Sequence, residues 1–260
     1  MAYTKKYNPN RSSEWNYGGE KWKLSRSKID LFIECPRCFY IDNVLGTKRP
    51  SIPAFTLNVA VDTLFKREFD AHRTAHTAHP LMQEYKINAV PYVHAALETW
   101  RDPFQGITHL HSETGLLVSG AVDDLWVTPV GSLIVVDYKA TSKPERIVTL
   151  DDSSWSEQYA RQIGVYQWLL KQNDFKVEKT GYFVYANGDA SRDTFSNTLN
   201  FETTVVPCHG ETDWIPAVLE RIKTCLTANT YPESGQSCEY CPYREACGKK
   251  LQSMHHGKEK

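Results

Sequence analysis

Apolar residues recur at helical spacing in some stretches of the chain and at strand-like spacing in others, and this change defines its elements. Helical spacing first appears after Ser25 and Ser27. Either serine is suited to cap a helix that runs into Cys35. The same spacing predicts helices over residues 57–69, 92–100, 156–171 and 213–227. Residues 71–80, rich in histidine and threonine, are expected to form a solvated loop.

Strand-like spacing begins at Ile107 and predicts five strands, with a turn at Gly131 and Ser132. The strands are expected over residues 107–111, 116–127, 133–140, 179–185 and 199–206. Neither an internal repeat nor a low-complexity linker interrupts this order. The pattern therefore favours an α/β fold with a central mixed β-sheet of about five strands, flanked by helices.

The sequence favours one domain over residues 24–250, between an N-terminal tail (1–23) and a C-terminal tail (251–260). Within this domain, the cysteine-bearing ends at residues 24–50 and 230–250 are expected to form a metal-cluster subdomain that joins the two ends of the chain. A chain of 260 residues, of which 41% are apolar, is long enough to bury a sizeable core.

Composition limits the partners and the location of the protein. The formal net charge is −1, so no global basic field attracts nucleic acid, although a catalytic cleft needs only a local basic lining. Residues 1–19 lack an apolar signal segment, and no run approaches the roughly 20 apolar residues of a membrane span. We therefore expect a cytoplasmic protein that has no membrane partner, in which clustered cysteines indicate a metal rather than disulfides.

Two acids and a lysine at the ends of apolar, β-branched runs carry the strongest chemical signal. Asp123 ends the stretch at residues 120–123, and Asp137 and Lys139 end the next predicted strand. Because a strand sends residues i and i+2 to the same face, Asp137 and Lys139 point together while Tyr138 turns away. Two carboxylates on neighbouring strands beside one ammonium suit Mg²⁺ or Mn²⁺ bound to a phosphate. The pattern indicates a metal-dependent nuclease.

A glutamine and a tyrosine, four residues apart on the helix after the Asp-Lys strand, complete a series of three motifs. The motifs, in chain order, are Gly120-x-x-Asp123, Asp137-x-Lys139 and Gln162-x-x-x-Tyr166. Their order and spacing resemble the RecB-like branch of the PD-(D/E)XK nuclease superfamily. The resemblance implies a restriction-endonuclease-like core in which the acids bind metal, the lysine is catalytic and the Gln/Tyr helix lies beside the site. The catalytic residues expected from it are Asp123, Asp137, Lys139, Gln162 and Tyr166.

The chain departs from this family at one position. The family usually has a metal-binding histidine in a Gly-x-x-x-His setting on an early helix, whereas Asp62 stands there in this chain. Aspartate is a competent ligand for Mg²⁺ or Mn²⁺, so the departure is compatible with activity and an altered metal preference, and equally with a weakened enzyme. The metal residues expected are Asp62, Asp123, Asp137 and Tyr138.

Cysteines at the two ends of the chain predict a second metal site. Cys35 lies near the N-terminus, and Cys238-x-x-Cys241-x5-Cys247 lies near the C-terminus. The set resembles the CRISPR-associated and AddB-like iron–sulfur nucleases, which implies a [4Fe-4S] cluster on these four cysteines, with Cys38 near it but not bound. In the alternative, Cys35 and Cys38 join Cys238 and Cys241 as two Cys-x-x-Cys pairs around a structural Zn²⁺, which leaves Cys247 unused.

The function favoured by these motifs is a deoxyribonuclease that depends on Mg²⁺ or Mn²⁺. By resemblance, it is an exonuclease acting on single-stranded or end-bearing DNA, with protein partners in DNA repair or CRISPR adaptation. The runner-up is a DNA-binding or assembly protein that keeps the fold and the cysteine site but is catalytically weak or inactive. Asp62 and the lack of net positive charge favour this second hypothesis.

Overall fold

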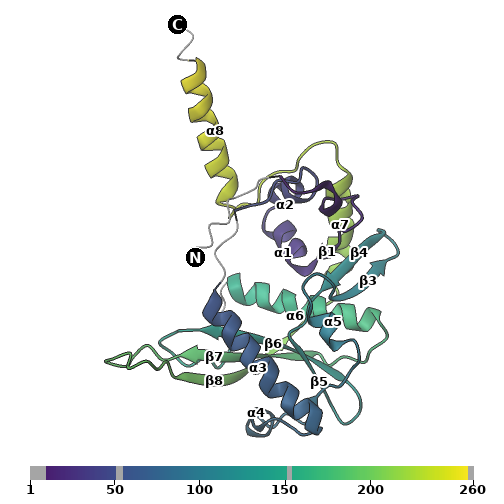
Figure 1. Ribbon diagram of the computed structural model, residues 1–260. Coiled ribbons are helices and arrows are strands. Elements are labelled where there is room, and N and C mark those ends of the chain that lie inside the picture. The colour runs from purple at the N-terminus through teal and green to yellow at the C-terminus, as the bar shows by residue number, and fades with distance from the viewer. Residues whose placement is uncertain (1–9, 51–54, 151–153, 257–260) are drawn as a thin grey trace. The chain divides into compact units, whose positions relative to one another are not determined.

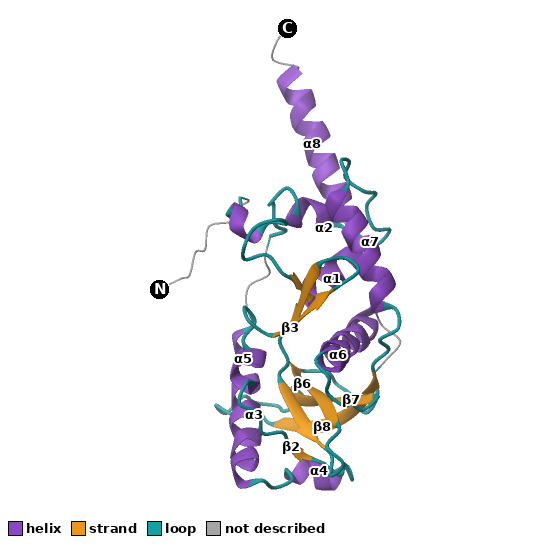
Figure 2. Ribbon diagram, turned by 90° about the vertical axis from the view of Figure 1, so that its right-hand side faces the viewer, coloured by secondary structure: helices purple, strands orange, loops and turns teal. Residues whose placement is uncertain are grey.

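A mixed five-stranded sheet forms the centre of the larger part of the molecule, as Figures 1 and 2 show. Its order is β2-β5-β6-β7-β8, and only β6 and β7 run parallel to each other. The strands are β2 (Val90–Pro91), β5 (Asp124–Val127), β6 (Leu133–Thr141), β7 (Thr180–Gly188) and β8 (Phe201–His209). With its flanking helices, this sheet confirms the α/β fold expected from the sequence.

The computed structural model describes residues 10–50, 55–150 and 154–256. The chain divides into two compact units. The first unit comprises Met1–Ile52, His111–Leu117 and Pro216–Lys260, and the second comprises Pro53–Leu110 and Val118–Ile215. This division does not test the single domain and the boundaries expected from the sequence, which stay predictions.

Two long helices cover opposite faces of the five-stranded sheet (Figure 2): α3 (Thr56–Ala75) and α6 (Ser154–Gln172). On the α3 face, the ring of Phe65 stacks on Tyr138 at 5.1 Å between centroids, within a buried apolar cluster. On the α6 face, the Tyr159 ring lies 5.4 Å from Phe183. Strand β6 is buried on both faces over its first six residues, which explains its continuous Leu-Ile-Val-Val run.

The first unit is built from helices and carries both ends of the described chain. Its elements are η1 (Ser13–Trp15), β1 (Leu24–Ser25), α1 (Arg26–Glu34), α2 (Pro36–Asn43), most of α7 (Ile215–Thr227), and α8 (Tyr240–His256). Phe32 of α1 and Phe39 of α2 meet edge to face at 5.3 Å, and the Trp22 indole donates a 3.0 Å hydrogen bond to buried Asn43. None of the helices in the described residues is long and apolar enough to cross a membrane.

The predicted number of strands in the main sheet is right, but its members differ. The strand predicted over residues 116–127 breaks into β4 (Leu116–Gly120) and β5, because the chain is diverted where the Val122 amide donates to the Trp100 carbonyl. β4 and β3 (Ile107–His111) belong to a separate, smaller sheet. The fifth strand of the main sheet is β2, which comes earlier in the chain than any of the predicted strands.

Two other expectations are corrected. The predicted helix 92–100 is only α5 (Leu97–Arg101), because the Tyr92 amide donates to Leu125 and so extends the sheet edge. The predicted loop 71–80 is largely ordered: α3 continues to Ala75, and α4 (Pro80–Glu84) follows. His79 caps α4 and stacks on Phe69 at 4.1 Å, where only 3% of it is exposed.

A fully buried acid ties the elements of the second unit together. Asp124, at the start of β5, is 0% exposed and accepts hydrogen bonds from the guanidinium groups of Arg73 on α3 and Arg101 on α5. Its other oxygen accepts a 2.7 Å hydrogen bond from the Tyr138 hydroxyl on β6. Such a charge is tolerated in the interior because each of its oxygens has a partner.

Replacing Asp124 with alanine should lower the free energy of unfolding by about 3–5 kcal/mol, since two buried guanidinium groups lose their shared counter-ion. Chemical denaturation of the purified protein measures this loss. Asp193→Ala, at an exposed position, is the matched control and should change stability by less than about 0.5 kcal/mol. Equal stability of the two variants would contradict the role given to Asp124.

Candidate active site

Four of the predicted catalytic side chains form one hydrogen-bonded chain on the α6 face of the sheet. Lys139 donates to the Asp137 carboxylate, next to it on the same face of β6, and lies 3.4 Å from the Gln162 amide oxygen. The Gln162 side-chain amide donates to Asp137 at 2.5 Å and lies 3.2 Å from the Tyr166 hydroxyl. The structure therefore brings together Asp137, Lys139, Gln162 and Tyr166, and it buries the carboxylate almost completely.

Asp123 lies in the short link between β4 and β5 and is held there by one backbone amide and one arginine side chain. The Tyr138 amide donates to Asp123 Oδ2 at 3.1 Å, and Arg101 Nε donates to the Asp123 carbonyl at 3.0 Å. The antiparallel register pairs Asp124 with Val136, which brings Asp123 opposite the Asp137 end of β6. The ring of Tyr166 can approach the chain closely here because residue 120 is a glycine: a Cβ at this position would lie only 2.8 Å from the ring.

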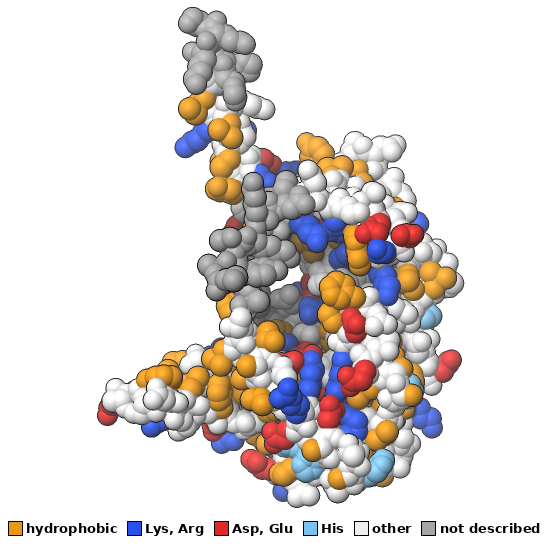
Figure 3. Space-filling view, in the orientation of Figure 1, with side chains coloured by type: hydrophobic (Ala, Val, Ile, Leu, Met, Phe, Trp, Pro, Cys, Tyr) orange, Lys and Arg blue, Asp and Glu red, His pale blue; other side chains and the backbone are white. Residues whose placement is uncertain are grey.

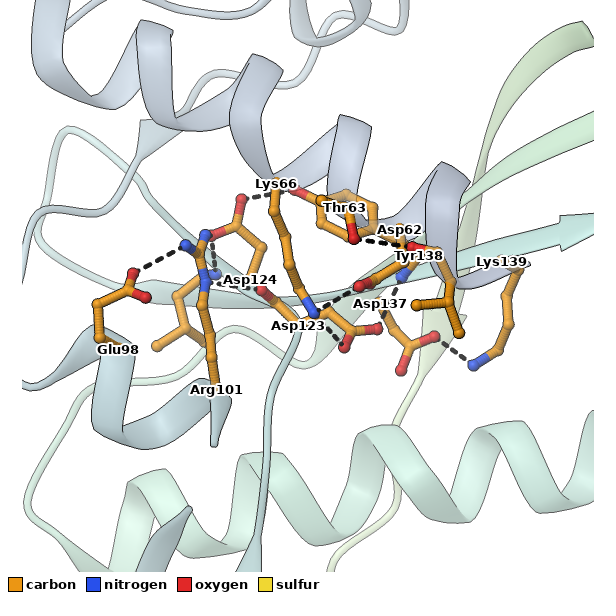
Figure 4. A network of polar contacts seen from close by, with 12 residues as sticks. Asp62, Thr63, Lys66, Glu98, Arg101, Asp123, Asp124, Asp137, Tyr138 and Lys139 are labelled. Atoms are coloured by element: carbon orange, nitrogen blue, oxygen red, sulfur yellow. Dashed lines mark hydrogen bonds and ion pairs between the residues drawn. The ribbon is translucent and has the colours of Figure 1, made fainter. Parts of the chain in front are cut away.

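Asp62 reaches this region from α3, and a lysine one turn further along accompanies it (Figure 4). The Lys66 ammonium lies 2.9 Å from Asp62 Oδ2 and 3.3 Å from Asp123 Oδ1, so it bridges the two carboxylates. Thus the side chain in the position of the usual histidine is linked to Asp123, one of the two predicted acids, through Lys66. Lys66 was not among the predicted site residues, although its spacing of four from Asp62 is the signal that identifies it.

Tyr138, expected among the metal residues, contributes its backbone amide to Asp123, whereas its side chain lies on the opposite face of the sheet. There its hydroxyl binds Asp124, and burial together with that charge raises its pKa well above the usual range. Its aromatic ring therefore supports the site from behind. The alternation of side chains along β6 had already predicted that Tyr138 turns away from Asp137 and Lys139.

The site holds acids and ammonium groups in balance. Burial raises the pKa of Asp62, although Lys66 opposes this effect. For Lys66, burial acts to lower the pKa, but the charges of Asp123 and Asp62 outweigh it and raise the pKa. For Lys139 the same competition, with Asp137 as the main counter-charge, also ends in a raised pKa. Both lysines therefore remain cationic at neutral pH.

The oxygen donors are of the kind that a hard divalent cation prefers, but among the described residues only the four cysteines form a group of three or more potential ligands within 4.8 Å of one another. Asp62 and Asp123 already share one cation, the Lys66 ammonium, and Asp137 faces a second ammonium on Lys139. Carboxylate oxygens without a nitrogen or sulfur donor are the ligand set that Mg²⁺ and Mn²⁺ prefer. The arrangement can therefore bind a phosphate through a metal on one side and through lysine on the other.

In the first unit, four buried cysteines form a second candidate metal site. The sulfur atoms of Cys35, Cys38, Cys238 and Cys241 all lie within 4.8 Å of one another. Within the described residues this group does not include Cys247, which is half-buried on α8. Cys38 thus occupies the place for which the sequence favoured Cys247, because the Cys-Pro-Arg-Cys turn opens α2 with both sulfurs on one side.

Charged and backbone donors surround these sulfur atoms. Arg244 lies 3.2 Å from the sulfurs of both Cys38 and Cys241, and Arg49 lies 3.4 Å from that of Cys238. The Gly235 amide donates to Cys35 Sγ at 3.2 Å, and a Cβ at Gly235 would collide with the carbonyl of the residue before Cys35. Such donors favour the thiolate, the form in which cysteine binds metal, but burial outweighs them at Cys38 and raises its pKa to about 12.

Comparison with known protein families identifies the superfamily of the chain. The fold and the acid–lysine site define a class of metal-dependent phosphodiester-cleaving enzymes. A family model described as the PD-(D/E)XK nuclease superfamily matches residues 56–248, and the chain belongs to this superfamily. A solved structure described as "Crystal structure of SSO0001" is 12% identical, with a TM-score of 0.40, and the similarity covers 84% of this chain and 82% of that one. No curated protein sequence matches.

Replacing Lys66 with methionine should raise the affinity for Mn²⁺ by about tenfold, because an ammonium no longer competes for Asp62 and Asp123. Isothermal titration of the metal into the protein without DNA measures this change. Lys171→Met, at an exposed position on α6, serves as the control and should bind Mn²⁺ like the unchanged chain. Weaker Mn²⁺ binding by the Lys66 variant would show that Lys66 holds the acids in place rather than competing for them.

Proposed function

We propose that this protein is a Mg²⁺- or Mn²⁺-dependent deoxyribonuclease, an exonuclease that acts on single-stranded or end-bearing DNA. The observation that carries the proposal is the continuous chain of hydrogen bonds through Lys139, Asp137 and Gln162, with Asp123 held against the same strand. It supports a site prepared for phosphodiester hydrolysis rather than a solvated strand end. Membership of the RecB-like branch, and partners in DNA repair or CRISPR adaptation, are part of this proposal.

The residues divide the chemical work between them. Asp62, Asp123 and Asp137 would hold the divalent cation, which supplies charge to the phosphate and acidity to the attacking water. Lys139 keeps its proton and places a positive charge beside the phosphate oxygens. Gln162 fixes the Asp137 carboxylate, so that this acid does not reorganise as charge develops.

A DNA-binding protein without catalytic activity is the second candidate. The ion pair of Asp62 with Lys66 favours it, since the position of the usual histidine is already engaged. The surface points the same way: in the view of Figure 3, Lys and Arg side chains are intermixed with Asp and Glu rather than gathered in one basic field. The completeness of the site around Asp137 and Lys139 supports the enzyme more strongly.

Lys139→Ala should lower the turnover of a labelled DNA strand by about 100- to 1,000-fold in the presence of Mg²⁺ or Mn²⁺, since a charge beside the phosphate is lost. Asp123→Ala should abolish cleavage, and EDTA should do the same to the unchanged protein. The control, Lys171→Ala, should retain full turnover. A protein that binds DNA but cuts it no faster than Lys139→Ala would support the non-catalytic alternative.

We further propose that the four clustered cysteines bind one structural Zn²⁺. A Zn–S bond of about 2.3 Å in a tetrahedral site implies sulfur atoms about 3.8 Å apart. The sulfur of Cys241 lies 3.7 Å from Cys35 and 3.6 Å from Cys38, and Cys38 lies 3.6 Å from Cys238. In a [4Fe-4S] cluster, each cysteine sulfur binds a different iron atom at a corner of the cube, so the cysteine sulfurs must lie farther apart than around one Zn²⁺. These distances support zinc over the [4Fe-4S] cluster that the sequence resemblance favoured.

The purified protein should be colourless and contain about one zinc per chain, as measured by metal analysis. Cys38→Ser should lose this zinc and unfold at lower temperature, because the metal links segments about 200 residues apart. Cys247→Ser is the matched control and should keep both zinc and stability. Brown protein with iron and sulfide, which bleaches when Cys247 rather than Cys38 is replaced, would show that the iron–sulfur alternative is right.

A further inference from the structure

A small cavity of about 250 Å³ opens beside the catalytic lysine in the second unit. It lies between the end of β6, the segment that follows it, and the start of α6. The side chains that line it include Lys139, Thr141, Lys143, Ile147, Tyr159 and Tyr185. Its volume is below the roughly 300–1,000 Å³ of sites for drug-sized ligands, so it suits one small group.

Two aromatic rings stand next to Lys139 in this cavity. The parallel register of β6 and β7 pairs Lys139 with Tyr185, so both side chains lie on the face covered by α6. From α6, Tyr159 brings its ring centroid to 4.7 Å from the Lys139 ammonium. The catalytic cation is therefore within reach of any planar group that stacks on Tyr159.

The wall formed by the segment after β6 is anchored. Buried Asn187 on β7 accepts from the Lys143 amide at 2.7 Å and donates to the Lys143 carbonyl at 3.0 Å. The Ser142 hydroxyl adds a 2.8 Å hydrogen bond to the Gly188 carbonyl. Hence Lys143 is carried on a fixed backbone, with its exposed side chain at the border between this cavity and a larger one at the base of the β7–β8 hairpin.

We propose that this cavity takes one unpaired nucleobase of the strand whose phosphate lies at Lys139, an inference that rests on the proposed nuclease function. The half-buried Tyr159 offers an aromatic face on which a base can stack, and the buried Tyr185 lines the cavity beside it. Every base has such a face whatever its sequence. Lys139 and Lys143 offer positive charge to the phosphates on either side of the base. An apolar metabolite would leave both lysines without a role, whereas a nucleotide uses the rings and the charges together.

The same geometry selects against a duplex. A base paired within a double helix has both faces stacked and its edge occupied, so it must leave the helix to enter the cavity. That step costs a few kcal/mol in a duplex and almost nothing in a single strand. The cavity thus provides a physical reason for cleaving single strands or frayed ends.

The test measures binding of a labelled 12-nucleotide strand by fluorescence anisotropy in EDTA, where no cleavage occurs. Tyr159→Ala and Tyr159→Leu should both weaken binding by about 5- to 150-fold, while Tyr159→Phe stays within about twofold. The leucine keeps an apolar side chain against Phe183, so it separates stacking from packing. Tyr243→Ala, which removes an exposed ring from α8, should bind like the unchanged protein.

A second test uses a series of strands, each lacking the base at one position. At one position the missing base should weaken binding by the same factor as Tyr159→Ala does, and combining the two changes should weaken binding no further. The proposal would be overturned if the Tyr159→Leu variant bound the strand as tightly as the Tyr159→Phe variant. It would also be overturned if Tyr159→Ala weakened the binding of single strands and of duplex DNA equally. Binding that depends on Tyr159 without cleavage in Mg²⁺ or Mn²⁺ would keep the nucleobase site and overturn the nuclease function.

Discussion

The buried carboxylate of Asp124 is the interaction on which the candidate active site depends. Its partners come from α3, α5 and β6, the three elements that also carry or contact Asp62, Asp123 and Asp137. Because a buried ion pair is stable only when every group is satisfied, the network admits one arrangement of these elements. The clamp therefore fixes the backbone from which the functional acids project, although Asp124 itself points away from the chemistry.

Neighbouring residues at the start of β5 and within β6 divide between support and function in the same way. Asp123 and Asp137 face the site, while Asp124 and Tyr138, one residue further along, face the clamp. A strand alternates its side chains, so each functional residue is backed by a structural one that is its covalent neighbour. This explains why two adjacent aspartates in one short stretch have different roles, and why the chain needs Arg101 to bind both the carbonyl of the first and the carboxylate of the second.

Local spacing predicted more of this site than of the sheet around it. The interval of two from Asp137 to Lys139 and of four from Gln162 to Tyr166 are properties of a single strand and a single helix, so the sequence determines them. The membership of β2 in the sheet depends on contacts between distant segments. This strand has only two residues, too few to show a periodic pattern in the sequence. For the cysteines, sequence counts candidates but gives no distances, and the choice between Cys38 and Cys247 depends on distances.

Asp62 and Lys66 form one charge-balanced pair beside the acids of the site. A neutral histidine at position 62, as the family resemblance implies, adds no charge to the two acids of the site. Aspartate adds a negative charge that burial makes costly, as its raised pKa shows. The ammonium of Lys66, 2.9 Å away, restores the charge of the site to the value that histidine would give. The charge of Asp62 is thus balanced within one helical turn, and a divalent cation that binds Asp62 has to displace this ammonium.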